Sequence, residues 1–225
     1  MNPIINAWSP RPRPARKPLE GSYCRLEPLD PVRHGDQLFE ACMASGAEER
    51  FRYLFDVPQD RASFSGWLAK AASTDDPLFF AVLDKASRRC EGRQSLMRIV
   101  PEHGVIEVGS ILWGPAIART RVATEAFFLF AQYAFDELGY RRFEWKCDAR
   151  NEPSLRAARR FGFTPEGIFR QHMVVKAENR DTAWFAMLNA DWPSIRSAFA
   201  RWLDPRNFDD RGQQKIRLED LRKTS

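Results

Sequence analysis

Apolar residues along the chain alternate between two spacings, one typical of strands and one typical of helices. Residues 23–29 predict a short strand. A helix over 31–45 follows the N-cap residue Asp30, and Asp60 opens a second helix with apolar residues on one face. Both helices therefore precede the main strands.

Three apolar runs follow, separated by polar or glycine- and proline-containing stretches, which indicates an antiparallel meander over 78–83, 94–100 and 105–113. The last strand leads into a long apolar-periodic helix over 122–138, which ends at Gly139. We expect the polar residues Glu125, Gln132 and Asp136 to share its outer face.

The second half of the chain repeats the alternation of strands and helices. It predicts a strand over 142–147, a short helix from about 151 to 160, strands over 167–175 and 182–188, and a helix over 192–202. These elements define an α+β fold, with a mixed, mostly antiparallel central sheet flanked by helices.

The length of 225 residues, with 44% apolar and 12% aromatic positions, suits one large domain with tails. We expect a basic, proline-rich N-terminal arm over 1–18, the domain itself over 19–203, and a charged, peripheral C-terminal extension over 204–225. The arm is expected to be solvated and partly ordered, and the alternative is docking on a neighbouring subunit or an acidic surface.

Several classes of protein are excluded by pattern. No apolar stretch approaches the length of a membrane span, and the first 30 residues lack the apolar run of a signal peptide. The four cysteines and three histidines are scattered, so we expect reduced thiols in a cytoplasmic protein and no bound metal. The net charge of +5 suits an anionic partner but falls short of a nucleic-acid-binding composition.

The loop between the third strand of the meander and the long helix is a candidate anion site. A helix N-terminus presents free backbone N–H groups and the positive end of the helix dipole. The small residues Ala118 and Ala123 allow close approach, while Arg119 and Arg121 supply positive charge. An ordinary turn with two solvated arginines is the alternative.

A second group of residues follows this loop in the sequence, and together the two motifs resemble a known order. Glu107-Val-Gly109 on a strand is followed by Ala123-Thr-Glu-Ala126, then by a strand, by Asn151-Glu-Pro-Ser154, and after one short helix by Gly162-Phe163. This order resembles the GNAT superfamily of acyl-CoA-dependent N-acetyltransferases, and within it the branch of ribosomal-protein N-terminal acetyltransferases. The resemblance covers about residues 20–190.

The resemblance implies acetyl-CoA as cosubstrate, with its pantetheine arm between the strands 105–113 and 142–147 and its pyrophosphate on the amides of 119–124. The family places glycine where this chain has Arg121, which we expect to take a conformation open to any residue. The residues predicted to bind the cosubstrate are Trp113, Arg119, Thr120, Arg121, Val122, Ala123, Thr124, Asn151 and Arg160, with packing in the core or along the cleft as the alternative for Trp113. Asn151 is equally suited to capping a helix, and Arg160 to a solvated helix face.

Acetyl transfer to an amine requires a neutral amine, a polarised thioester carbonyl and a proton for the departing thiolate. Glu107 matches the strand glutamate of the family and is the candidate base; the alternative is an exposed strand residue. Amides of 108–110 are expected to polarise the carbonyl. Ser154 is the candidate donor to the thiolate, with helix capping as its alternative.

The predicted function is transfer of an acetyl group from acetyl-CoA to a primary amine, either a protein N-terminus or a small molecule, by direct attack in a ternary complex. Two alternatives remain open: a CoA-binding module without activity, and a protein that associates with RNA or the ribosome through its basic arm. The sequence does not identify the acceptor, and a homodimer is left open.

Overall fold

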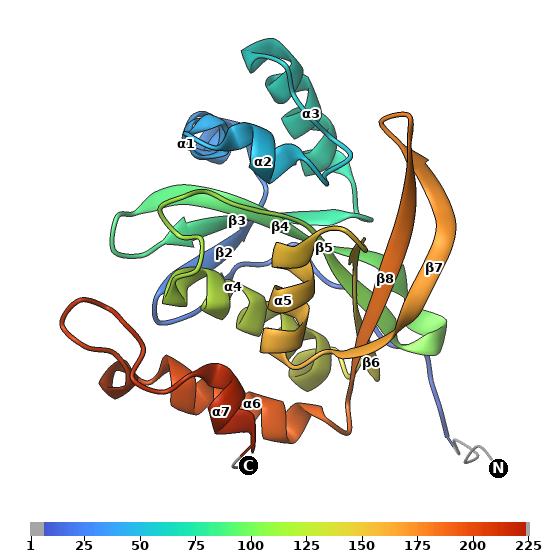
Figure 1. Cartoon of the computed structure of the whole chain (residues 1–225), viewed down its shortest axis with the longest axis vertical. Helices are drawn as coiled ribbons and strands as arrows, with labels where there is room; N and C mark the ends of the chain where they lie inside the picture. Colours follow the sequence, from blue (N-terminus) through green and yellow to red (C-terminus); the bar gives the residue numbers. More distant parts are fainter. Residues whose placement is uncertain (1–6, 224–225) are drawn as a thin grey trace.

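One twisted sheet of eight strands runs through the molecule, with helices on both faces (Figure 1). In the computed structural model, which describes residues 7–223, the strand order is β1-β2-β3-β4-β5-β6-β8-β7. Among these described strands, neighbours are antiparallel except for the parallel pair β5 and β6. The bounds are β1 (Leu19–Glu20), β2 (Cys24–Pro28), β3 (Leu78–Asp84), β4 (Arg89–Val100), β5 (Val105–Trp113), β6 (Arg142–Asp148), β7 (Thr164–Val175) and β8 (Glu178–Leu188).

The first three helices cover one face of the sheet and the later helices cover the other (Figure 1). The first group is α1 (Pro31–Met43), α2 (Ala47–Phe51) and α3 (Arg61–Ser73); the second is α4 (Arg121–Gln132), α5 (Glu152–Phe161), α6 (Trp192–Leu203) and α7 (Leu218–Lys223). The mixed α+β fold class is confirmed. No helix in the described part of the chain is both long and apolar enough to cross a membrane.

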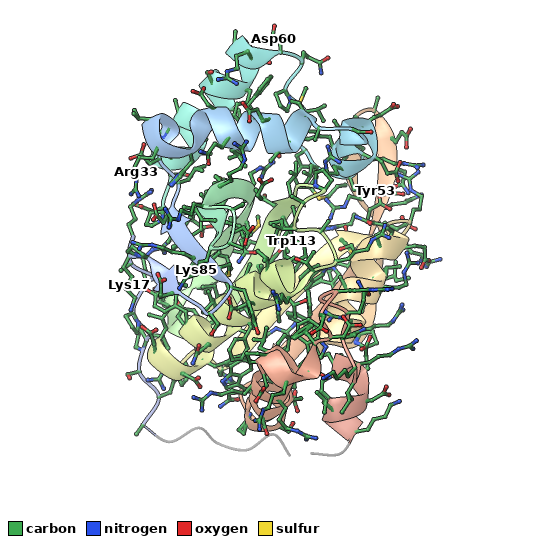
Figure 2. All side chains as sticks on the ribbon, turned by 90° about the vertical axis from the view of Figure 1, so that its left-hand side faces the viewer. Lys17, Arg33, Tyr53, Asp60, Lys85 and Trp113 are labelled. Carbon is green, nitrogen blue, oxygen red and sulfur yellow. The ribbon has the colours of Figure 1, made fainter. Side chains whose placement is uncertain are left out.

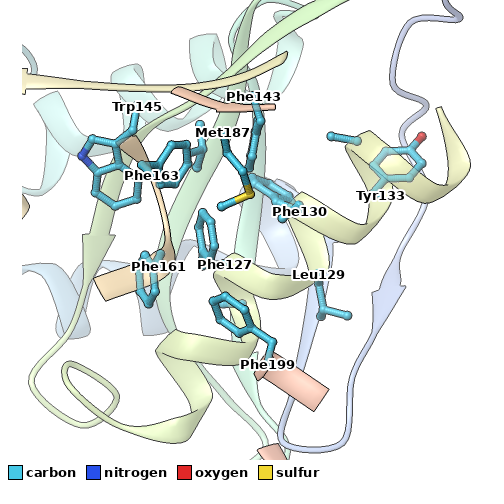
Figure 3. Close-up of a cluster of buried hydrophobic side chains, with 14 of the residues drawn as sticks. Phe127, Leu129, Phe130, Tyr133, Phe143, Trp145, Phe161, Phe163, Met187 and Phe199 are labelled. Carbon is cyan, nitrogen blue, oxygen red and sulfur yellow. The ribbon is translucent and has the colours of Figure 1, made fainter. Parts of the chain in front are cut away.

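The larger core lies between the sheet and α4, and aromatic rings fill its centre (Figure 3). Phe127 of α4 is fully buried and stacks on Phe161 of α5, with 4.3 Å between the ring centroids. Phe143 and Phe163 also contact Phe127, so one ring joins a helix, a strand and the end of α5. This packing fixes α4 and α5 against the strands between which the site is formed.

The parallel pair opens partway along its length. Residues Val105–Val108 of β5 pair with Arg142–Trp145 of β6, but beyond them β5 continues to Trp113 without pairing to β6. A bulge in β5 begins at this point, where Ser110 has a left-handed φ of 49°. A parallel pair that separates at a bulge leaves unpaired backbone on both strands.

Most predicted elements are present, with shifts at their ends. The helix expected over 122–138 is α-helical only from Arg121 to Gln132, and a π-helical turn, Tyr133–Glu137, completes it. The sequence pattern missed three short elements, β1, α2 and α7. These elements are too short to show a clear hydrophobic period.

The expectation that Glu125 lies on the outer face of its helix is wrong. Glu125 is 3% exposed, and its carboxylate accepts hydrogen bonds from the backbone N–H groups of Ser22, Tyr23 and Cys24 at 2.6 to 2.8 Å. The turn that joins β1 to β2 lies over α4 at this point, so tertiary contact buries a polar position that the helical period places outside.

The described part of the N-terminal arm lies against the domain through a few hydrogen bonds and ion pairs. In the arm, the N–H of Ala15 donates to the Tyr133 hydroxyl at 2.8 Å, Arg16 donates to the carbonyl of Ala72, and Lys17 pairs with Glu137. Residues 7–18 are thus held in place by these contacts but are exposed or half-buried, as expected for a solvated and partly ordered arm, while residues 1–6 lie outside the described residues.

The C-terminal extension is not peripheral, because Phe208, Leu218 and Leu221 are buried in the larger core. These three apolar residues are too few and too widely spaced in a charged segment to show a hydrophobic period, so their burial could not be predicted from the sequence. The boundaries at residues 18 and 203 stay predictions.

Replacing the buried carboxylate of α4 tests this packing. Glu125→Gln keeps the shape but puts an NH₂ group where one oxygen accepts hydrogen bonds, so we expect the free energy of unfolding to fall by about 1–3 kcal/mol. Glu137→Gln, at an exposed pair with Lys17, is the matched control and should change it by less than about 1 kcal/mol. Urea denaturation measures both, and equal losses would contradict this role of Glu125.

Candidate active site

A cavity of about 410 Å³ opens where β5 and β6 separate. Its lining includes Glu107, Trp113, Arg119, Asn151 and Ser154, all predicted site residues. They come from strand β5, the loop after it, and the start of α5. The separation of the strands therefore brings the two sequence motifs to one place.

Glu107 is buried rather than exposed on its strand. It is 4% exposed, and its Oε2 lies 2.7 Å from Lys146 Nζ and 3.2 Å from Arg98 Nε. Burial raises the pKa of the Glu107 carboxyl, while the charges of Lys146 and Arg98 oppose this effect. Lys146 also contacts Glu144 at 2.6 Å, so one lysine bridges two carboxylates.

The sequence analysis missed Lys146, although alternation along the strand 142–147 places it on the same face as Glu144. The available signal was this alternation, which places the opposite charges of Glu144 and Lys146 on one face of the strand.

The bulge in β5 is held by a buried arginine that the sequence analysis also missed. Arg93 of β4 is 1% exposed and donates from Nη1 to the carbonyl of Ser110 at 2.9 Å. It also pairs with Asp56, and its guanidinium lies 4.2 Å from the centre of the Trp67 ring. Because a trans peptide is planar, the N–H of Ile111 points away from Arg93. Ile111 lines the cavity, so Arg93 orients a backbone donor at its wall.

Helix α4 begins beside a second cavity of about 1000 Å³, which all six residues of the predicted anion loop line. Thr120 is the N-cap, and its hydroxyl accepts from the N–H of Val122 at 3.2 Å. Within residues 7–223, the N–H groups of Arg121 and Ala123 have no hydrogen-bond acceptor. Two such donors at a helix N-terminus favour an anion.

The left-handed conformation in this loop falls on Arg119, with φ 65°, and not on Arg121. Arg121 occupies the first helical turn, and its guanidinium lies 4.5 Å from the centre of the Tyr23 ring. Arg160 lines the same cavity and donates to the Thr124 hydroxyl at 3.1 Å. The arginine in place of the family's glycine is therefore accommodated without backbone strain at that position.

At the start of α5, the hydrogen bonds show whether Asn151 or Ser154 caps the helix. Asn151 is the N-cap, and its side chain accepts from the N–H of Ser154 at 3.2 Å. The Ser154 hydroxyl instead accepts from Trp145 Nε1 at 3.0 Å. Burial raises the pKa of the neighbouring Cys147 thiol, and a hydrogen bond with Ser154 opposes that shift. Capping therefore belongs to Asn151 and not to the Ser154 side chain.

The two cavities meet, because Trp113, Arg119, Pro153 and Ala157 line both. Trp113 lies near the middle of the molecule in Figure 2, between the α1 layer and the helices below it. The smaller cavity holds Glu107, Asn151 and Ser154; the remaining predicted residues, Thr120, Arg121, Val122, Ala123, Thr124 and Arg160, line the larger one. A continuous groove thus joins the carboxylate to the anion loop.

Comparison with known proteins agrees with this arrangement. The model of the acetyltransferase (GNAT) domain matches residues 25–164. A GCN5-related N-acetyltransferase from Brucella melitensis is 59% identical with a TM-score of 0.96, covering 97% of this chain and 100% of that chain. A probable GNAT-family acetyltransferase from Chromobacterium violaceum is 41% identical with a TM-score of 0.79, covering 86% of this chain and 96% of that chain.

Other matches have lower sequence identity and cover less of this chain. The probable N-acetyltransferase YjcK of Bacillus subtilis is 30% identical over 52% of this chain and 65% of its own length. The chain thus spans just under two thirds of the curated relatives that it matches. The ribosomal L7/L12 alpha-N-protein acetyltransferase RimL, at 17% identity and a TM-score of 0.67 over 80% of this chain and 98% of its own, shares the fold. The chain belongs to the GNAT family of acetyltransferases.

Proposed function

We propose that this protein transfers the acetyl group of acetyl-CoA to a primary amine within a ternary complex. The observation that carries the proposal is the continuous groove between the unpaired amides at the start of α4 and the buried carboxylate of Glu107. A cosubstrate with phosphates at one end and a thioester at the other suits such a groove. Four free cysteines in the described residues agree with action in a reducing cytoplasm.

The cosubstrate residues act in two groups in this proposal. The amides of Arg121 and Ala123 bind the pyrophosphate, and Arg119 and Arg160 add positive charge. Trp113 and Asn151 line the passage that the pantetheine arm follows toward the gap between β5 and β6. The N–H of Ile111, oriented through Arg93, polarises the thioester carbonyl, in addition to the predicted amides of 108–110.

The chemistry then follows from the groups around the carbonyl. Glu107 takes the proton of the acceptor ammonium, directly or through water, and the amine nitrogen attacks the carbonyl carbon. A C–N bond forms and the C–S bond breaks, with the electron pair leaving on sulfur. The nitrogen loses a second proton as the amide forms, which balances the proton that the thiolate takes up. Ser154 donates a proton or a hydrogen bond to the departing thiolate.

Ser154→Ala should lower kcat more than it weakens acetyl-CoA binding, because a thiolate forms only as the C–S bond breaks. The substitution also leaves Trp145 Nε1 without its acceptor, so some stability is lost as well. Asp60→Ala, which removes the N-cap of α3 at a residue that lines none of these cavities, is the control for a loss of stability without a role in the site. Rates per folded molecule and melting temperatures of both variants distinguish a donor role of Ser154 from a structural role. An unchanged kcat in Ser154→Ala would reject the donor role.

Calorimetry with acetyl-CoA, followed by an acceptor screen that records free thiol release, tests the function. Binding together with amine-dependent release supports it. Binding without turnover of any amine would indicate a CoA-binding module, and no binding at millimolar acetyl-CoA would reject both. RNA retention that falls with salt and is abolished by deletion of residues 1–18 would favour the RNA-associated alternative.

A further inference from the structure

An arginine at the end of the cleft away from the anion loop forms no salt bridge within residues 7–223. Arg180 of β8 lines the 410 Å³ cavity and also a neighbouring cavity of about 560 Å³, which lies toward α2 and the β7–β8 hairpin. The two cavities also share Glu49, Tyr53 and Asp148. Arg180 therefore lies at a junction of these two cavities and does not line the 1000 Å³ cavity of the anion loop.

The carboxylates whose charges reach Arg180 are already paired. Asp148 contacts Arg150 at 3.2 Å, and Glu107 contacts Lys146 and Arg98. Among residues 7–223, Arg180 forms no salt bridge, and its Nε is buried without a hydrogen-bond partner. A half-buried cation with unused donors is costly unless a ligand supplies the charge.

Phe55 and Met173 contact the guanidinium of Arg180 but do not accept strong hydrogen bonds from it. Its Cζ lies 4.9 Å from the centre of the Phe55 ring, and its Nη1 lies 4.0 Å from the Met173 sulfur. Both contacts are apolar or weak. A planar guanidinium fixed in this way matches the two oxygens of a carboxylate.

We propose that the acceptor is a small amine that also carries a carboxylate, which Arg180 binds while the amine reaches Glu107. The inference rests on the proposed acetyl transfer, and it adds the class of acceptor. The charged residues that line the 410 Å³ cavity agree with it: Arg50, Arg98, Arg119, Lys146 and Arg180 outnumber Glu49, Glu107 and Asp148. With Arg119 assigned to the pyrophosphate, four cations still face three carboxylates, and an acceptor without an anion would leave that excess unmatched.

Matched acceptors test the proposal. A series of ω-amino carboxylates, from glycine to aminohexanoate, is assayed beside the corresponding carboxamides, which keep the amine and the length but lose the charge. We expect kcat/KM for the best carboxylate to exceed that of its amide by roughly 10- to 100-fold. In glycine the amide form has the less basic amine, so any bias there favours the amide.

Arg180→Gln should reduce this preference to about one while the KM for acetyl-CoA stays unchanged, and Arg180→Lys should restore part of it. Arg201→Gln, at an exposed arginine of α6 that lines none of these cavities, is the matched control and should keep the full preference. Melting temperatures identify any variant that fails to fold.

Equal rates for carboxylate and amide in the parent protein would overturn the proposal. So would equal losses for both in Arg180→Gln, or a raised KM for acetyl-CoA. Acetylation of plain amines without a preference would reject only the acceptor class, whereas no acetylation of any amine would reject the proposed function itself.

Discussion

Glu107→Gln should lower turnover by about 100-fold or more at neutral pH, because the acceptor ammonium then loses its base. Turnover of the variant should rise about tenfold per pH unit below the pKa of the amine, near 10.4 for a lysine-like group, as the neutral amine forms unaided. In the parent, burial raises the pKa of Glu107, so the acid limb of the rate profile should lie above the ordinary value for a glutamate. Steady-state rates from acid to alkaline pH measure both effects.

Glu144→Gln is the control for the charge change. Glu144 contacts the same lysine, Lys146, at 2.6 Å but does not line the cavity. Both substitutions remove one carboxylate from one lysine, so a purely structural role of Glu107 predicts similar losses in the two variants. A large loss of turnover in Glu107→Gln alone supports the base, and parent-like turnover of that variant at neutral pH would contradict it.

Arg121→Pro should weaken acetyl-CoA binding by roughly 10- to 100-fold relative to Arg121→Ala, since it removes one backbone donor to the pyrophosphate. Proline suits this position, because the first helical turn requires no intrahelical bond from that N–H and Thr120 before it is extended, with φ −99° and ψ 176°. Calorimetric titration of acetyl-CoA into each variant measures the difference.

The alanine variant separates backbone from side chain. Both substitutions remove the guanidinium from the Tyr23 ring, so that loss cancels in the comparison. The free energies of unfolding of the two variants should agree within about 0.5 kcal/mol. Equal affinities of the two variants for acetyl-CoA would show that this amide does not bind the cosubstrate.

Long periodic segments were predictable from the sequence, and contacts between distant segments were not. The strand over 105–113 and the helix of α3 follow from hydrophobic period and capping by Asp60. The burial of Glu125 depends on a turn about a hundred residues away, which no local pattern encodes. The burial of the C-terminal segment through Phe208 depends on tertiary packing in the same way.

The candidate site shows the same division. The resemblance drew attention to Glu107 and Ser154, and the structure adds the partners that determine their chemistry, Lys146 and Trp145. Arg93 and Arg180 were not singled out because each lies among ordinary charged residues in the sequence. Arg93 is distinguished by its burial, and Arg180 by the absence of a salt bridge among residues 7–223. Both properties arise only from the folded structure.

A single turnover with acetyl-labelled acetyl-CoA tests direct transfer most directly. Excess protein is mixed with the labelled cosubstrate and an amine from the acceptor screen, quenched at intervals, and the label is followed in the amine and on the protein. Direct attack in a ternary complex predicts that labelled amine appears at the rate at which free thiol appears, with no label bound covalently to the protein. Label that accumulates on the protein before it reaches the amine, for example on Cys147 beside Ser154, would contradict it.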